Sequence, residues 1–300
     1  MNLTLSTGKA IRGDLILRAA IRSDLAPIPA TLEADIRADS DMRRLLAEGQ
    51  TISAGPASIP FYIAKFELLP VRASQGIHDL AAVRITGLLA SCHGLAFVRR
   101  QGQAIIKSDS TLSAVYRASG ATTSVDGAIR VSSFACLVGG TPTYHIARAL
   151  QEEGAVIRAK AGKVRAFRLQ DLWQQKPVIE VPANLMKFEA SGFLERHDSP
   201  SFFSVADEGE TVAGNTSKAR AATYKPGSDE RVLRNMTRCL IRRGVARVNP
   251  SWQVDAGDLV TVQGQKKPLA VMTAAHVFRG GTDGSGADQY TRLWLGSLEG

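Results

Sequence analysis

A strict alternation of apolar and polar residues near the N-terminus constrains the fold most. Over residues 30–37, Ala30, Leu32, Ala34 and Ile36 alternate with polar residues. A period of two places one set of side chains in a core and the other in solvent, which is typical of a β-strand with one buried face. Further strands are predicted over residues 61–66, 82–86, 259–262, 269–276 and 290–295. The chain is therefore expected to be mainly β at both ends.

Helices are predicted almost entirely in the middle of the chain, apart from a short one within residues 39–48. Ser110 can cap a helix that ends at Gly120. Thr141 and Pro142 can begin a second helix, which ends at Gly154. The apolar positions of these two helices are Leu112, Val115 and Tyr116, and Ile146, Ala149 and Leu150. In the second helix, Arg148 and Glu152 are spaced to pair one turn apart. A hairpin over residues 156–169, with its turn at 161–162, is predicted to follow.

These patterns predict a mainly β (α+β) fold with three segments. Residues 1–104 and 176–300 are each expected to form a tube-like, β-barrel domain, and residues 105–175 an α+β segment between them. Residues 256–296 are expected to close the second barrel. Residues 231–247 are ambiguous, because arginines have helical spacing while Cys239 and Ile241 fit a strand. A strand is favoured there.

Charge and cysteine content limit the possible functions. The 300 residues carry a net charge of +9 and a pI near 9.7, which permits nucleic acid, an anionic surface or an acidic protein as partner. Three widely separated cysteines form no CxxC pair, so neither a zinc site nor a disulfide framework is predicted. No signal peptide and no membrane-spanning run is expected.

The segment ending in His276 is the most tempting catalytic candidate, since residues 271–276 look like the histidine segment of chymotrypsin-like proteases. Asp283 and Ser285 follow it. Only 24 residues remain after His276, too few to bring an acid and a nucleophile alongside it. A buried strand histidine is therefore favoured, and a hydrolase using His276 is the alternative.

Other candidate sites are weaker. Cys136 with His145 could supply a nucleophile and a base, but a packed cysteine is favoured. Cys92 and His93 would point to opposite faces of a strand and so would not share a metal. Glu195 and Asp198 beside His197, and the glycines from Gly280 to Gly286, are interpreted as loops. No catalytic, cofactor-binding or metal-binding residue is predicted, and the chain is expected not to be an enzyme.

A basic stripe suggests a second alternative, a DNA-binding module. It comprises Arg231, Arg234, Arg238, Arg242, Arg243 and Arg247. Stacking on bases needs interleaved aromatic residues, and the nearest are Tyr224 and Trp252. A solvated or subunit-facing stripe is favoured.

Two segments resemble the baseplate hubs of long-tailed bacteriophages and the related spike base of type VI secretion. One is the capped helix over 141–154 with its Arg148…Glu152-x-Gly154 end, followed by a hairpin. The other is the Gly257-Asp258 turn followed by three strands, one carrying His276. The helix over 110–120 is also similar to a hub helix.

The resemblance implies a non-enzymatic homotrimer that joins a hexameric tail tube to a central spike and lines the tail channel. It implies partners in the tail tube or distal tail protein and the spike, with the tape measure and other baseplate proteins as further candidates. It implies no cofactor and no membrane insertion, and a location in the virion after assembly in the host cytoplasm. The net positive charge is not explained by it.

Overall fold

The computed structural model describes residues 1–75, 78–98, 104–189, 200–215, 221–281 and 286–299. The strands of the large sheet are β1 (Leu3–Leu5), β2 (Ile16–Asp24), β3 (Ala30–Ala38), β4 (Thr51–Ala54), β5 (Ile59–Gln75), β6 (His78–Leu89), β12 (Ile179–Val181), β13 (Met186–Phe188), β17 (Cys239–Val248), β18 (Leu259–Val262), β19 (Leu269–Arg279) and β20 (Asp288–Glu299). The α-helices are α1 (Ser40–Leu45), α2 (Leu112–Ala118), α3 (Pro142–Glu152) and α5 (Glu230–Thr237). The predicted mainly β class is confirmed.

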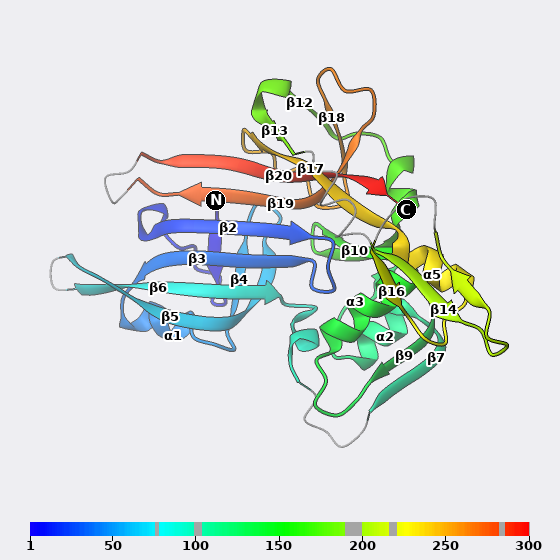
Figure 1. Cartoon of the computed structure of the whole chain (residues 1–300). Helices are drawn as coiled ribbons and strands as arrows, with labels where there is room; N and C mark the ends of the chain where they lie inside the picture. The colour runs from blue at the N-terminus through cyan, green and yellow to red at the C-terminus, as the bar shows by residue number, and fades with distance from the viewer. Residues whose placement is uncertain (76–77, 99–103, 190–199, 216–220, 282–285, 300) are drawn as a thin grey trace.

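Both ends of the chain contribute to one twelve-stranded sheet, which Figure 1 shows running across the upper left of the molecule. Its main path is β1-β4-β5-β6-β3-β2-β19-β20-β17-β13, and β18 and β12 branch from β19. The antiparallel pairing of β2 with β19 joins the N-terminal strands to the C-terminal ones. The alternation over residues 30–37 has the expected effect, since Leu32, Ala34 and Ile36 are at most 1% exposed.

The sheet contains an internal duplication of strand order. The first strand set is β1-β4-β5-β6-β3-β2, and the second strand set, β12-β18-β19-β20-β17-β13, has the same strand order. The sets differ at one end, because β1 pairs with β4 antiparallel whereas β12 pairs with β18 parallel. A register shift breaks the β5–β6 ladder between Ile63 and Lys65, and an equivalent shift breaks the β19–β20 ladder between Val271 and Thr273. The duplication therefore includes this β-bulge, a feature that locally bends and twists a strand, whereas the shifts between Ile16 and Arg18, Leu68 and Arg72, and Arg242 and Gly244 each occur in one set only.

Each strand set has its own apolar core but does not close into a barrel. Val181, Met186, Val260, Val271 and Leu295, from five strands of the second set, belong to one buried cluster. Within the described residues, β12 and β13 do not pair with each other, and neither do β1 and β2. The two sets are thus barrel-like but open, and they share a sheet instead of forming two separate tubes. The limits at residues 104 and 175 stay a prediction.

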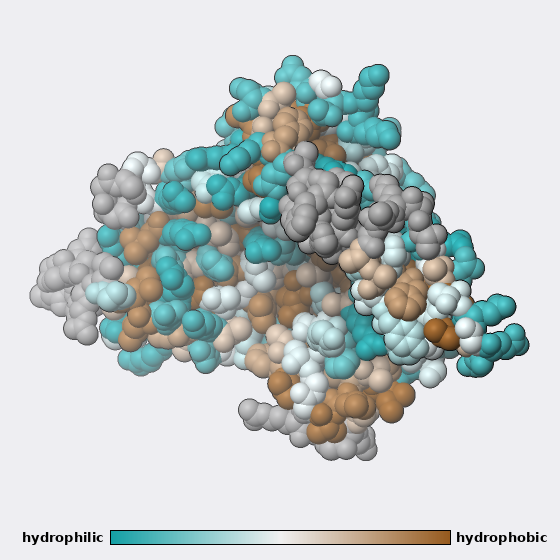
Figure 2. Space-filling model, in the orientation of Figure 1, coloured by the Kyte–Doolittle hydropathy of each residue, from teal (hydrophilic) through white to brown (hydrophobic). Residues whose placement is uncertain are grey.

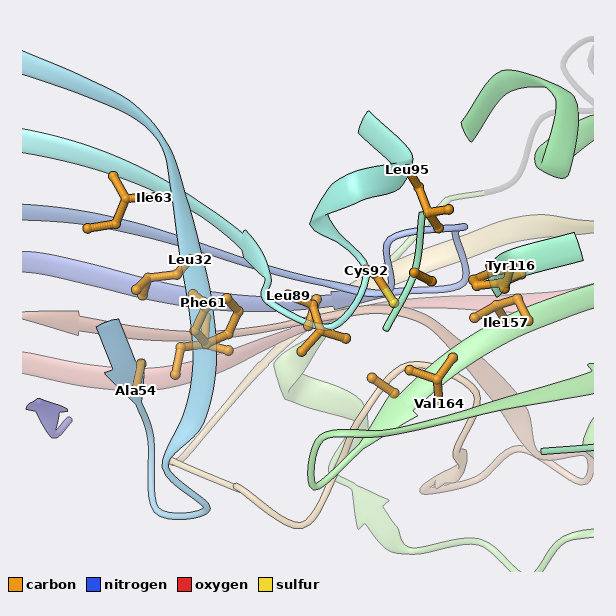
Figure 3. Packing of buried hydrophobic residues seen from close by; sticks show 14 of the residues in the cluster. Leu32, Ala54, Phe61, Ile63, Leu89, Cys92, Leu95, Tyr116, Ile157 and Val164 are labelled. Carbon is orange, nitrogen blue, oxygen red and sulfur yellow. The ribbon is translucent and has the colours of Figure 1, made fainter. Parts of the chain in front are cut away.

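The middle segment packs against the first strand set near the β2–β3 turn and the end of β6. It contains β7 (Ile105–Thr111), β8 (Val125–Asp126), β9 (Arg130–Cys136), β10 (Ala155–Lys160) and β11 (Lys163–Arg168). Figure 3 shows that the core continues from Leu32 and Phe61 through Leu89 to Tyr116 and Ile157. The Tyr116 hydroxyl donates to the Pro27 carbonyl at 3.0 Å and so ties this segment to the β2–β3 turn.

The predicted helices and hairpin of this segment are confirmed, with one change at a helix start. The Thr111 hydroxyl, and not Ser110, caps α2 by accepting from the Ala114 amide at 3.2 Å. Ser110 is instead part of β7. Thr141 takes the N-cap position of α3 as expected, but its side chain makes no capping hydrogen bond, and Pro142 takes the first helical position, where a missing amide proton costs nothing.

The strand favoured for residues 231–247 is wrong in its first half. Residues Glu230–Thr237 form α5, because the Asp229 carboxylate accepts from the Val232 amide at 2.7 Å and begins the helix. Leu233 and Met236 pack with Phe202 in a small core of their own. This core belongs to a module with three short strands, β14 (Ser201–Val205), β15 (Thr211–Ala213) and β16 (Ala222–Tyr224). The predicted strand begins only at Cys239.

Candidate assembly surface

The seam between the two strand sets buries the strongest catalytic candidate. His276 on β19 lies opposite Ile21 on β2 and is 4% exposed. Its Nδ1 is 3.0 Å from the Thr291 hydroxyl, and its ring stacks on Trp252 with centroids 4.4 Å apart. Burial lowers the pKa of His276 to about 4, so the imidazole is neutral near pH 7. His276 is the buried strand histidine favoured from the sequence, and Asp283 and Ser285 lie outside the described residues.

The Gly257-Asp258 turn is an acidic socket for the β10–β11 hairpin. The Asp258 carboxylate is 3% exposed and accepts from Arg158 at 2.9 Å and from Lys160 at 2.9 Å. Gly257 has φ +85°, and a Cβ there would lie 2.8 Å from Arg158 Cδ, so a glycine is needed on two grounds. The motif that marked the resemblance therefore joins the middle segment to the second strand set.

A second buried carboxylate lies beside this socket. Asp255 lies close enough to Asp258 for the two charges to interact. Between them in the sequence, the Ala256 amide donates to the Ser23 hydroxyl of β2 at 2.9 Å. Burial, reinforced by the neighbouring Asp258 charge, raises the pKa of Asp255 to about 6. The joint between the sheet and the hairpin thus holds two close carboxylates and two cations.

The end of α3 is a second acidic socket, and it holds α5 and the loop before it. Glu153 is buried and accepts from Arg231 at 2.8 Å, while Glu152 accepts from Lys225 at 2.9 Å. The predicted Arg148–Glu152 pair is present at 3.1 Å. These groups line a polar cavity of about 380 Å³ between α3, β9 and residues 225–229. The three cations in its wall are paired with Glu152 and Glu153, and the Asp229 carboxylate accepts from the Val232 amide, so the positive and negative charges of the wall balance.

The predicted basic stripe is divided between two elements and is largely neutralised. Arg231 and Arg234 lie on α5, whereas Arg242, Arg243 and Arg247 lie on β17. Arg238 lies between the two elements and donates to the Asn235 side chain at 3.4 Å. The other five have carboxylate partners. Their ion-pair partners are Glu153, Glu230, Glu189, Glu299 and Asp288. These carboxylates give the arginines partners within the fold, as a solvated or subunit-facing stripe predicts, although ion pairs between exposed groups are individually weak.

Two predicted pairs have the packed character favoured from the sequence. Cys136 is buried, and both its Sγ and His145 Nε2 border Gly140, so the two side chains are neighbours. The cavity wall includes His145 but not Cys136. Cys92 and His93 do not lie on a strand as expected, because His93 begins a 3-10 helix (His93–Ala96) that Cys92 precedes. Burial raises the pKa of Cys92 to about 11, while His93 stacks on Tyr62 with ring centroids 4.1 Å apart.

The other candidate residues lie partly outside the described ranges. Glu195, His197 and Asp198 lie outside the described residues, as do residues 282–285 of the glycine-rich loop. Within the described ranges, no group of three or more His, Cys, Asp or Glu is arranged to hold a metal ion. None of the helices in those ranges combines the length and apolarity needed to cross a membrane.

Exposed apolar side chains are the surface feature that the sequence did not reveal. Leu68 on β5 is 57% exposed and Phe188 on β13 is 50% exposed. Ile106, Leu137 and Val138 are also exposed, at the end of the β7–β9 pair, and Figure 2 shows a hydrophobic area at the lower edge of the molecule there. Phe66 and Leu68 share strand parity, which could have indicated a covered face, but only the structure shows that Leu68 is uncovered.

No protein-family model matches the sequence, and no curated protein matches it significantly. Solved structures do match. The 43 kDa tail protein of prophage MuSo2 from Shewanella oneidensis aligns with a TM-score of 0.65 at 11% identity, over 98% of this chain and 97% of that one. A tail protein from Neisseria meningitidis gives 0.64 at 11% identity, over 99% and 95%. The chain has the fold of phage tail proteins.

A chain of the PdpA–VgrG complex from Francisella matches as well, with a TM-score of 0.54 at 8% identity. The alignment covers 99% of this chain but 52% of that chain, so this protein corresponds to about half of it. The resemblance to tail hubs and to the type VI spike base is thus confirmed for the fold, and no catalytic family is indicated.

Proposed function

We propose that this protein is a structural hub of a phage baseplate, a homotrimer that joins the hexameric tail tube to the central spike and lines the tail channel. The observation that carries the proposal is the duplicated strand set. Three copies of a chain with two similar sets present six similar units to a sixfold tube and three subunits to a threefold spike. Closed rotational symmetry then reconciles the two.

The shared fold of tail proteins supports this assignment. The seam supports it too, because β2 and β19 already join two sets into one sheet within a single chain. The partners would be the tail tube or distal tail protein and the central spike, with the tape measure and other baseplate proteins as further candidates. The protein would then belong to the virion tail and assemble in the host cytoplasm.

A reconstruction of the assembled tail tests the proposal. We expect three copies of the chain in a ring around the channel, between the tube and the spike. A position with any other symmetry, or a location away from the channel, would refute it. The His276→Ala variant addresses the hydrolase alternative, since loss of a measurable peptidase or esterase activity from a folded protein would contradict a structural role.

A further inference from the structure

The duplication gives residues of the first strand set counterparts in the second, and the pairing registers of the strands identify these counterparts. Across the first set, Ile21 pairs with Leu32, Leu32 with Gly87, and Gly87 with Ile63. In the second set the corresponding row is Phe188, Gly244, Leu295 and Val271. Phe188 therefore occupies the position of Ile21.

The same relation connects β5 with β19. Each strand has its bulge at the start of this region, so Lys65 corresponds to Thr273 and Leu68 to His276. Loop contacts agree, because the Gly49 amide donates to the Ile63 carbonyl as the Gly257 amide donates to the Val271 carbonyl, 2.9 and 2.8 Å respectively. Both glycines have a positive φ, at 88° and 85°.

Equivalent residues differ sharply in burial. Ile21 and His276 face each other across the seam and are 5% and 4% exposed. Their counterparts, Phe188 and Leu68, are 50% and 57% exposed. The difference arises because the edge of β19 beyond Thr273 is paired with β2, whereas the corresponding edge of β5 is not paired with any described strand. Among the described residues, β13 likewise has β17 as its only partner.

We infer that β13 of one copy pairs antiparallel with the free edge of β5 in a second copy of this chain, with Phe188 opposite Leu68. The seam within the chain is the template for this contact, since β13 corresponds to β2 and β5 to β19. Repeating this contact from copy to copy makes the sheet continuous. The closure of that sheet after three copies rests on the proposed function. An exposed strand edge and two uncovered apolar side chains then acquire a partner.

Two polar features belong to the same contact. The Phe66 amide points to the free edge of β5 and donates to the Glu48 side chain at 3.3 Å, so that contact must open when a strand arrives. The template register also places Glu189 opposite Glu67, as Arg22 lies opposite Ala275. Each glutamate already has a cation partner, Arg242 and Lys65 respectively. Like charges directly opposite oppose pairing, so Glu67→Gln should strengthen association.

A cysteine pair tests the contact and its register. Directly opposed residues in a sheet have Cβ atoms about 4.5–5.5 Å apart, near enough to form a disulfide after a small adjustment. Under mild oxidation, the Leu68→Cys/Phe188→Cys chain should form disulfide-linked dimers and trimers. Each single variant is the control for the native cysteines. The Leu68→Cys/Lys187→Cys chain is the control for register, because neighbouring strand residues point to opposite faces.

Light scattering on the same samples separates this inference from the proposed function. Cross-linking of the Leu68–Phe188 pair, but not of the controls, supports the contact. A trimer without this cross-link overturns the contact and leaves the hub proposal standing. A chain that stays monomeric and gives no cross-link at its highest soluble concentration also overturns the contact, while the hub proposal is decided by the tail reconstruction. Because Leu68 and Phe188 are exposed in the single chain, Leu68→Glu should leave its thermal unfolding unchanged while abolishing the trimer.

Discussion

Replacing Asp258 by asparagine should weaken the joint between the β10–β11 hairpin and the second strand set. The substitution keeps the shape of the side chain and its ability to accept hydrogen bonds, but it removes the charge that balances Arg158 and Lys160. Arg158 is 13% exposed, so its guanidinium would lose its buried counter-ion. Lys160 is 44% exposed and can turn toward water.

The size of the effect follows from these exposures. Removing one partner of a buried ion pair costs about 3–5 kcal/mol, because the remaining charge stays buried. The amide oxygen retains part of the interaction with Arg158, and the loss of the Asp258 charge relieves its repulsion of Asp255. We therefore expect the free energy of unfolding to fall by about 2–3 kcal/mol.

Urea unfolding gives the change in free energy, and hydrogen exchange shows where it acts. The amides of the hairpin should lose protection before those of the first strand set. Asp35→Asn is the matched control, because its bidentate partner Arg84 is 46% exposed and can be solvated when the carboxylate is removed, so this change should cost less than Asp258→Asn. If Asp258→Asn and Asp35→Asn cost the same, the buried socket is not what holds the hairpin.

Three further predictions concern the same region. The pKa of His276 is about 4 in the folded protein against an ordinary 6.5, so stability should fall by about 3 kcal/mol as the pH drops from 6.5 to 4, and His276→Gln should reduce that slope in unfolding curves. The pKa of Asp255 is raised from 3.8 to about 6, so its contribution is lost as the pH rises through that window; Asp255→Asn should gain relative to wild type over the same window, and a constant difference would contradict this. Gly257→Ala should lower the melting temperature more than Gly264→Ala does, because both have φ above +80° but only the first would press on Arg158.

Local patterns in the sequence predicted the elements of the fold where one signal dominated. The period-two run at 30–37 and the Thr141–Gly154 helix both formed as expected. The strand prediction failed for residues 230–237, because the arginine spacing indicated a helix while the apolar residues indicated a strand. The cap of α5 by Asp229 and the burial of Leu233 against Phe202 decided the outcome. Such tertiary contacts override weak local preference.

The candidate surface was far less predictable. The sequence indicated that His276 would be buried in a strand, but not that Trp252 and Thr291 would enclose it. No short-period repeat is evident in the sequence, although the two strand sets share strand order and a bulge. Burial explains why: one set carries His276 in its seam where the other carries the exposed Leu68, so equivalent positions require different side chains. The duplication is preserved in backbone pairing, which a hydrophobic pattern specifies only loosely.

The positions of the extra segments explain how a duplicated sheet can keep its edges available. In the first set, β2 and β3 are joined directly through residues 25–29, whereas in the second set the module with α5 occurs between β13 and β17. That module enters and leaves at strand ends, and it is held by the acidic socket on α3 through Glu152 and Glu153. Insertions at strand ends leave the hydrogen-bonding edge of β13 unoccupied by the described residues. The chain can thus acquire a second module without losing the edge through which, on the inference above, each copy joins the next.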